Sequence, residues 1–412
     1  MNPRAIVADA LVTGDGPVFS DGAVIVSEDG SVLDVGRGDE VLPRHAGLPV
    51  ERIHGIVFPG LVNAHTHIEL SGLRGQIAGG AGFVPWVERM IGVRIQAHPE
   101  EDDGAITRAV EELHAAGTAA VGEVTNSLAA VGALARRGLA GCIFHEVLGV
   151  NSAEVLAKIE GLDRAVEARV GVWPSADLAY CPAPHTLYTT HADAVRMLMS
   201  ASKATGRRTT VHLAEHAAER RALEAGDGPI ADWYERFLKL PRERIAWPRM
   251  SPIAFAGHLG VLAPNVLLVH LTDARPEELD QVVASGAPVV LCPRSNLYIE
   301  TKLPPLVAMR AAGIAPALGT DSLASNASLD VLAEARALGD RFSSVPAADL
   351  VQMATWNGAQ AIGRHDLGRL AKGARPGIVA VDGDPGGDPC AFLLRNLRAP
   401  RRWIARRAPG AA

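Results

Sequence analysis

Short apolar runs of β-forming residues alternate with stretches of helical periodicity between positions 56 and 321 of the chain. This alternation is typical of parallel β/α units, because two parallel strands need a crossover, usually a helix, between them. Eight runs predict strands, at 56–65, 119–124, 142–148, 170–180, 209–213, 266–271, 288–292 and 314–320. Eight such units predict an α/β fold, a (β/α)8 barrel of the TIM type, whose chemistry lies at the carboxyl ends of the strands.

The two ends of the chain differ in character from this central part. Short β segments at 5–12, 22–27 and 31–35 are broken by Gly-Asp and Asp-Gly turns, and a turn at 368–373 precedes another β segment at 378–381. We therefore expect a small β-sandwich domain built from residues 1–56 and 367–412, beside a catalytic barrel of residues 57–366. In the helix expected after position 328, Ser328 is the predicted N-cap.

Bulk properties exclude several classes of function. The net charge of −6 over 412 residues gives no basic surface for nucleic acid. No apolar run reaches the ~18 residues that span a bilayer, and the N-terminus lacks a signal-peptide core, so we expect a cytoplasmic protein without a membrane partner. The sequence leaves open whether the protein forms a homo-oligomer. The four cysteines are scattered, which favours buried free thiols over a disulfide framework.

Side chains that can bind a metal stand at the ends of the predicted strands. His65 and His67 close the first run, and residues i and i+2 of a strand point to the same face, so both imidazoles can reach one cation. His212 ends the fifth run, His270 ends the sixth, and Asp321 follows the eighth. Imidazole nitrogen and carboxylate oxygen are the usual ligands of a catalytic zinc or iron that keeps one position open for water.

These residues carry a resemblance to the amidohydrolase superfamily, in its branch of mononuclear-metal deaminases that act on purines and related rings. The segments that carry it are 59–67, the pair His212 and Glu215, His270, 292–296 and 319–326. Within that branch, segments 67–71, 233–239 and 321–329 most resemble aminodeoxyfutalosine deaminases of the alternative menaquinone pathway.

The resemblance implies a metal site and two proton-transfer groups. The implied metal ligands are His65, His67, His212 and Asp321, and the implied catalytic residues are Glu215, His270 and Asp321. Two-metal relatives bridge their ions with a modified lysine on the fourth strand. The predicted fourth strand and residues 181–185 contain no lysine, so we expect one divalent transition metal ion, zinc or iron.

The implied substrate contacts are Glu69, His185, Ser325 and Arg74, with Arg294 and Lys302 as other candidate partners for a substrate carboxylate. The function implied is hydrolytic deamination of an adenine nucleoside derivative, 6-amino-6-deoxyfutalosine first. The alternatives are adenosine, methylthioadenosine, S-adenosylhomocysteine or guanine as substrate, a chlorohydrolase of the same branch, or a noncatalytic scaffold.

Overall fold

Two four-stranded parallel sheets form the body of the protein. The structure is a computed structural model that describes residues 3–96 and 99–406, so positions 1–2 and 407–412 of the predicted small domain lie outside the described residues. One sheet has the order β5 (Leu61–Thr66), β6 (Thr118–Thr125), β7 (Ala140–Val147), β8 (Leu178–Pro184). The other has the order β12 (Ala317–Leu318), β11 (Val289–Leu291), β10 (Val266–His270), β9 (Thr209–Leu213).

The edges of the two sheets meet at both sides. Isolated parallel bridges join Thr66 to Asp321, between β5 and the end of β12, and Thr186 to His212, between the end of β8 and β9. The predicted α/β class is confirmed. The closed eight-stranded barrel remains a prediction, because strand pairing is continuous only within each sheet.

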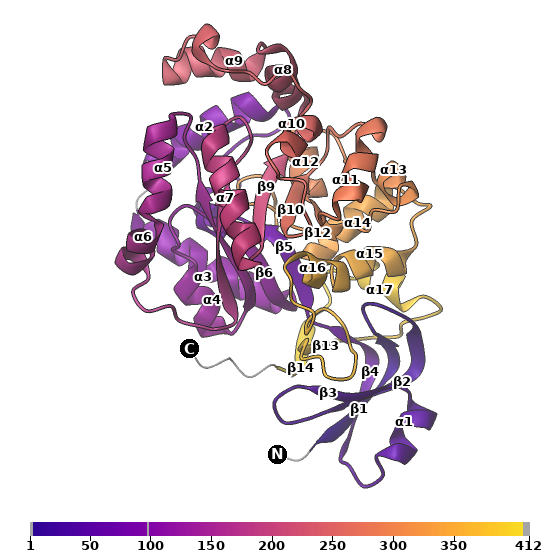
Figure 1. The fold of residues 1–412 in the computed structure, drawn as a ribbon. Coiled ribbons are helices and arrows are strands. Elements are labelled where there is room, and N and C mark those ends of the chain that lie inside the picture. Colours follow the sequence, from indigo (N-terminus) through magenta and orange to yellow (C-terminus); the bar gives the residue numbers. More distant parts are fainter. Residues whose placement is uncertain (1–2, 97–98, 407–412) are drawn as a thin grey trace.

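Helices cover the outer faces of the two sheets, as Figure 1 shows. Among the described residues, none of them has both the length and the apolar character needed to cross a bilayer. Apolar side chains of the helices pack on the strands, as with Ile106, Val110 and Leu113 of α3, all buried as their spacing predicts. The helices are α2 (Phe83–Gln96), α3 (Pro99–Ala115), α4 (Val131–Arg137), α5 (Ser152–Glu160), α6 (Leu162–Arg169), α7 (Ala192–Thr205), α8 (Ala217–Ala225), α9 (Pro229–Trp233), α10 (Pro252–His258), α11 (Leu279–Ser285), α12 (Pro293–Glu300), α13 (Leu306–Ala311), α14 (Val331–Arg341), α15 (Ala347–Met353), α16 (Trp356–Ala361) and α17 (Pro389–Arg395).

Both ends of the chain contribute to one six-stranded sheet. Its order is β14 (Arg401–Ala405), β13 (Ile378–Asp382), β4 (Val50–Pro59), β1 (Arg4–Val12), β2 (Val18–Val26), β3 (Val32–Arg37), with α1 (Gly38–Arg44) beside it. In Figure 1 this sheet lies at one end of the molecule, and α8 and α9 lie at the other. The predicted sandwich is unconfirmed, since the described strands of this part form a single sheet.

Three local predictions differ from the structure. The run 56–65 belongs to two strands, β4 and β5, which separate at Gly60, where a side chain would meet the Pro376 carbonyl. The fourth strand is Leu178–Pro184, later than the predicted 170–180, because α6 ends at Arg169 and Gly171 then turns with φ +70°. The N-cap of α14 is Asp330, which accepts a hydrogen bond from the backbone of Leu332, and Ser328 instead accepts one from Arg294.

Gly319, directly after β12, lies against His65 of β5 without room for a side chain. A Cβ at this position would lie 2.6 Å from the Cβ of His65 and 2.7 Å from its carbonyl oxygen. We expect Gly319→Ala to lower the free energy of unfolding by ~1–3 kcal/mol, because the strands must separate to admit the methyl group. Thermal unfolding measures this. The control is Gly92→Ala in α2, where a Cβ meets nothing within 4 Å, and an unchanged midpoint for Gly319→Ala would contradict the packing argument.

Candidate metal centre and active site

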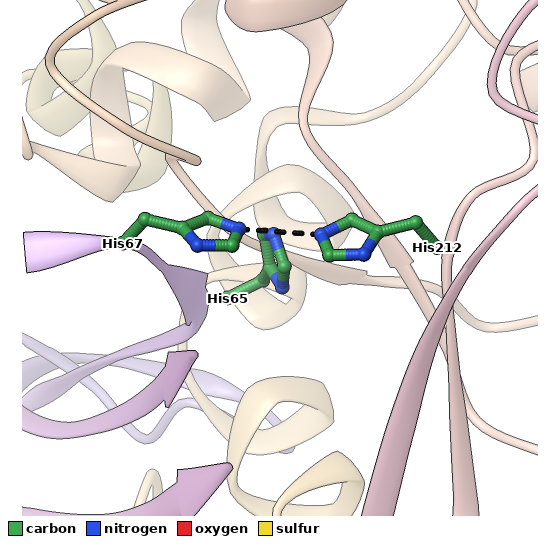
Figure 2. Close-up of side chains that lie close together, drawn as sticks. All are labelled: His65, His67 and His212. Carbon is green, nitrogen blue, oxygen red and sulfur yellow. Dashed lines mark hydrogen bonds between the residues drawn. The ribbon is translucent and has the colours of Figure 1, made fainter. Parts of the chain in front are cut away.

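Three histidines converge at the carboxyl ends of β5 and β9. His65 lies within β5, His67 directly follows that strand, and His212 lies within β9. Figure 2 shows their rings pointing toward one another, with His65 between the other two. The Nε2 atoms of His67 and His212 are 3.2 Å apart, and one ligand atom from each of the three residues lies within 4.8 Å of the others. These three side chains can hold one metal ion.

The chemistry of the donors fits a cation. Nε2 of His65 is buried and has no hydrogen-bond partner among the described residues, which is costly unless a ligand occupies that position. Burial, followed by the neighbouring histidines, holds the pKa of His65 well below its ordinary value. A neutral imidazole keeps the lone pair that a metal ion requires.

His212 is also fixed in orientation. Its Nδ1 lies 2.9 Å from the carbonyl oxygen of His185, so Nδ1 carries the proton and donates to that oxygen. Nε2 then keeps its lone pair and can bind a metal ion. Burial lowers the pKa of His212 to about 3, with the charge of His185 as the next cause.

Asp321 completes the fourth side of this cluster. Its Oδ1 lies 3.9 Å from Nε2 of His65 and 3.8 Å from Nε2 of His67. Its Oδ2 accepts a hydrogen bond from Ser295 at 2.6 Å, and its φ of +57° turns the chain at the strand end. Burial alone would raise the pKa of Asp321, but the charges of His67 and His270 and the Ser295 bond outweigh it, so the pKa lies below its ordinary value.

Glu215 and His270 form a pair beside the metal centre. Oε1 of Glu215 lies 3.6 Å from Nε2 of His270, whose ring stacks on His212 at 5.6 Å between centroids. Burial raises the pKa of Glu215 well above its ordinary value, and the charges of Asp321 and Glu219 add to the shift. Burial lowers the pKa of His270 to about 4. A carboxyl group whose pKa is raised, next to a neutral imidazole, is suited to proton transfer.

The predicted substrate contacts divide into two groups. His185 lies against the centre, with its ring centroid 5.0 Å from that of His212. Ser325 is fully buried and bonds to Ser295 and Asp321. The oxygens of Glu69 accept hydrogen bonds from Thr125 and from residues 126 and 127, and neither oxygen is left without a donor. Its contact with a substrate remains a prediction.

Each cation proposed for a substrate carboxylate already has an acidic partner. Arg74 pairs with Glu112, Lys302 pairs with Asp273, and Arg294 lies 3.6 Å from Glu334. Arg74 and Arg294 also line a cavity of about 570 Å³, together with Ser325. Each partner lies on another element of the chain, so these pairs could not be predicted from local sequence patterns.

Sequence reasoning missed three residues of the site. Ser295 and Asn296 lie in the segment 292–296 that carried the family resemblance, but no role was assigned to them; Asn296 lies 3.2 Å from Nδ1 of His270. The third is Glu146, near the end of β7, and the signal that could have identified it is a charged residue near the carboxyl end of a predicted strand. Glu146, His185 and His212 form a second group of possible ligands within 4.8 Å of one another.

Comparisons with known proteins match most of the chain. A model of the amidohydrolase family matches residues 56–403. The chain is 29% identical over 369 residues to the aminodeoxyfutalosine deaminase of Deinococcus radiodurans, with 87% of this chain and 86% of that protein covered. It is 33% identical over 403 residues to a 5-methylthioadenosine/S-adenosylhomocysteine deaminase of Halobacterium salinarum, with 93% and 85% covered.

A crystal structure of Helicobacter pylori aminofutalosine deaminase in complex with methylthio-coformycin has the same fold. Its TM-score is 0.86 at 23% identity, with 97% of this chain and 98% of that chain covered. The matches extend over nearly the whole chain.

We expect one equivalent of a divalent transition metal per chain, and less than a tenth of that in His65→Ala and His212→Ala. The second group of possible ligands shares His212, whose Nδ1 is already committed to a backbone carbonyl, so it does not offer an independent site. Elemental analysis of purified protein measures the content, and His54→Ala, an exposed histidine, is the control. Circular dichroism should show the fold retained, and two tightly bound equivalents would contradict a mononuclear site.

Proposed function

Because the chain belongs to the amidohydrolase family, it is a hydrolase acting on carbon–nitrogen bonds, and we propose that it deaminates 6-amino-6-deoxyfutalosine, an adenine nucleoside derivative. The proposed reaction releases ammonia and belongs to menaquinone biosynthesis by the futalosine route. One observation carries the proposal: a buried His65–His67–His212 cluster lies next to the Glu215–His270 pair.

The proposed metal ligands are His65, His67, His212 and Asp321, with one zinc or iron ion as the resident metal. Such an ion would lower the pKa of a water molecule from about 15.7 toward about 7 and so supply a nucleophile at neutral pH. The remaining steps depend on the protein's own side chains.

Deamination requires two proton transfers around the attacked ring carbon. Oxygen from water adds to the carbon that bears the amine, and the adjacent ring nitrogen takes one of the two water protons. The amine takes the other proton, and the carbon–nitrogen bond breaks with its electron pair on ammonia as the carbonyl forms. Glu215 is suited to carry these protons, since it lies beside His270 and burial raises its pKa well above its ordinary value.

His270 and Asp321 have supporting roles in this scheme. His270 is fully buried and neutral, and it directs the attacking water toward the ring carbon. Asp321, whose pKa is low, remains an anion and accepts the proton that the water loses. His185 borders the same space and contacts the nucleoside.

The substrate proposal depends on similarity as well as on geometry. The Deinococcus relative is an aminodeoxyfutalosine deaminase, and segments 67–71, 233–239 and 321–329 resemble that group. A second candidate is methylthioadenosine or S-adenosylhomocysteine, which the 33% identity to the Halobacterium protein favours. Both candidates have an adenine and a ribose, so the same proton-transfer groups serve either one.

The organisation of the chain is proposed on similar grounds. We infer that the two parallel sheets form one (β/α)8 barrel of residues 57–366, with residues 1–56 and 367–412 as the small β domain. The bridges at Thr66 and Thr186 support closure of the barrel. The cytoplasmic location and the homo-oligomer stay predictions.

We expect Glu215→Gln to lower kcat by ~10²–10⁴-fold while KM and metal content stay near their wild-type values, because glutamine cannot carry the proton. Steady-state ammonia release and elemental analysis measure the three quantities. Glu277→Gln, at an exposed position, is the control. Near wild-type turnover by Glu215→Gln would assign the proton transfer to another group, with His270 as the next one to test.

We expect kcat/KM for aminodeoxyfutalosine to exceed that for adenosine by more than tenfold, since a charge-assisted contact to the benzoate arm contributes ~1.5–3 kcal/mol. The preference should shrink in Arg74→Ala and not in Arg37→Ala, an exposed arginine of the terminal sheet. A panel with methylthioadenosine, S-adenosylhomocysteine and guanine completes the measurement. Higher kcat/KM for adenosine or methylthioadenosine would contradict the proposed substrate but not the proposed deaminase activity.

A further inference from the structure

Glu146 is a buried carboxylate with one oxygen that has no hydrogen-bond donor. Its side chain is 6% exposed, and Oε1 has no partner among the described residues. Oε2 accepts a hydrogen bond from Nδ2 of Asn126 at 3.1 Å. A buried carboxylate oxygen without a donor is unfavourable, so its presence calls for a ligand that supplies one.

The position of Glu146 within the fold places it at the active site. Cys142 and Phe144 belong to the buried cluster inside the parallel sheets, and Glu146 continues their alternation along β7, so it faces the same side. Its Oε1 lies 3.6 Å from Nδ1 of His212, and His185 lies within the same group of ligand atoms.

Glu146 lies away from the atoms that react. Nδ1 of His212 is on the far side of the ring from Nε2, which faces His67. Nδ1 already donates to the His185 carbonyl, so it does not satisfy Glu146. A substrate group that contacts Glu146 is therefore remote from the ring carbon where ammonia leaves.

The carboxylate is held in place by a chain of hydrogen bonds. Glu69 accepts bonds from the backbone of Asn126 and Ser127 and thereby fixes this segment. The amide of Asn126 then donates to both the carbonyl and Oε2 of Glu146. Glu69 has a full set of donors, while Glu146 presents a free acceptor. Glu69 is thus a positioning residue that acts through Asn126.

We propose that Glu146 accepts a hydrogen bond from a ribose hydroxyl of the nucleoside and so selects ribonucleosides over their deoxy analogues. An adenine nucleoside has two kinds of strong donor, the amine at the reacting carbon and the ribose hydroxyls. The amine belongs at the metal side of His212, which leaves the hydroxyls for Glu146. The inference rests on the proposed function, because it requires a nucleoside substrate.

The test compares adenosine with 2′-deoxyadenosine and 3′-deoxyadenosine, which differ by one hydroxyl. Ammonia release is measured for the wild-type protein, Glu146→Gln and the exposed control Glu154→Gln. We expect Glu146→Gln to lower kcat/KM for adenosine by about 10- to 100-fold, the loss typical of one charge-assisted hydrogen bond. The value for one deoxy analogue should change less than threefold, because that analogue lacks the hydroxyl that Glu146 binds.

Metal content separates this role from a structural one. It should equal that of the wild type in Glu146→Gln, since the carboxylate is not a ligand in the proposal. Equal losses for adenosine and both deoxy analogues, or loss of metal, would overturn the inference and make Glu146 a support for His212. Asn126→Ala, which removes the hydrogen bonds from the Asn126 amide to Glu146, should reduce the same preference for adenosine over the deoxy analogue. It provides a second variant if Glu146→Gln does not fold.

Failure of the proposed function gives a different result. If the wild-type protein releases no ammonia from adenosine, its deoxy analogues or any nucleoside of the substrate panel, the proposed function is wrong, and the inference falls with it. If the wild-type protein deaminates these nucleosides and Glu146→Gln keeps the full preference for adenosine, only the inference is wrong.

Discussion

The backbone carbonyl of His65 joins the two ends of the strand series and fixes the metal site at the same time. It accepts hydrogen bonds from the backbone of Thr320 at 3.0 Å and of Asp321 at 3.1 Å. Asn63 reinforces the contact, since its side chain bonds both to the hydroxyl and to the backbone N–H of Thr320. Two proposed ligands that are 256 positions apart thus meet through adjacent main-chain atoms. These main-chain bonds, rather than side-chain attraction, place the carboxylate beside the histidines.

Burial determines the protonation states on which the chemistry depends. The same desolvation that keeps the imidazoles of His65, His212 and His270 neutral also raises the pKa of Glu215, because it penalises the charged form of each group. Asp321 is the exception, since the nearby histidines and the Ser295 bond outweigh its burial and lower its pKa. One enclosed site therefore holds one carboxyl group with a raised pKa and one with a lowered pKa near each other, a pairing that the proposed deamination would use.

The sequence predicted the residues whose position follows from a strand end. His65, His67, His212, His270 and Asp321 lie together because parallel strands bring their carboxyl ends to one rim. The fourth strand was misplaced, since the β-forming residues at 170–173 are followed by Pro174 and contain the turn at Gly171. The partner of Arg74 was not predictable either, because Glu112 reaches it from α3 through tertiary packing that no local pattern records.

The distribution of charge in the site is the final constraint on its ligand. Glu146, Glu215 and Asp321 surround the histidines, and none of the three forms an ion pair with a lysine or arginine of the described residues. Like charges in a buried site repel one another, and the charge of Asp321 adds to the burial that raises the pKa of Glu215. A divalent cation between the imidazoles would offset this repulsion at Asp321, while a neutral, hydroxyl-bearing substrate would satisfy Glu146. The site is thus complementary to a metal ion together with a nucleoside, and an anionic group on that substrate has to lie outside this ring of carboxylates.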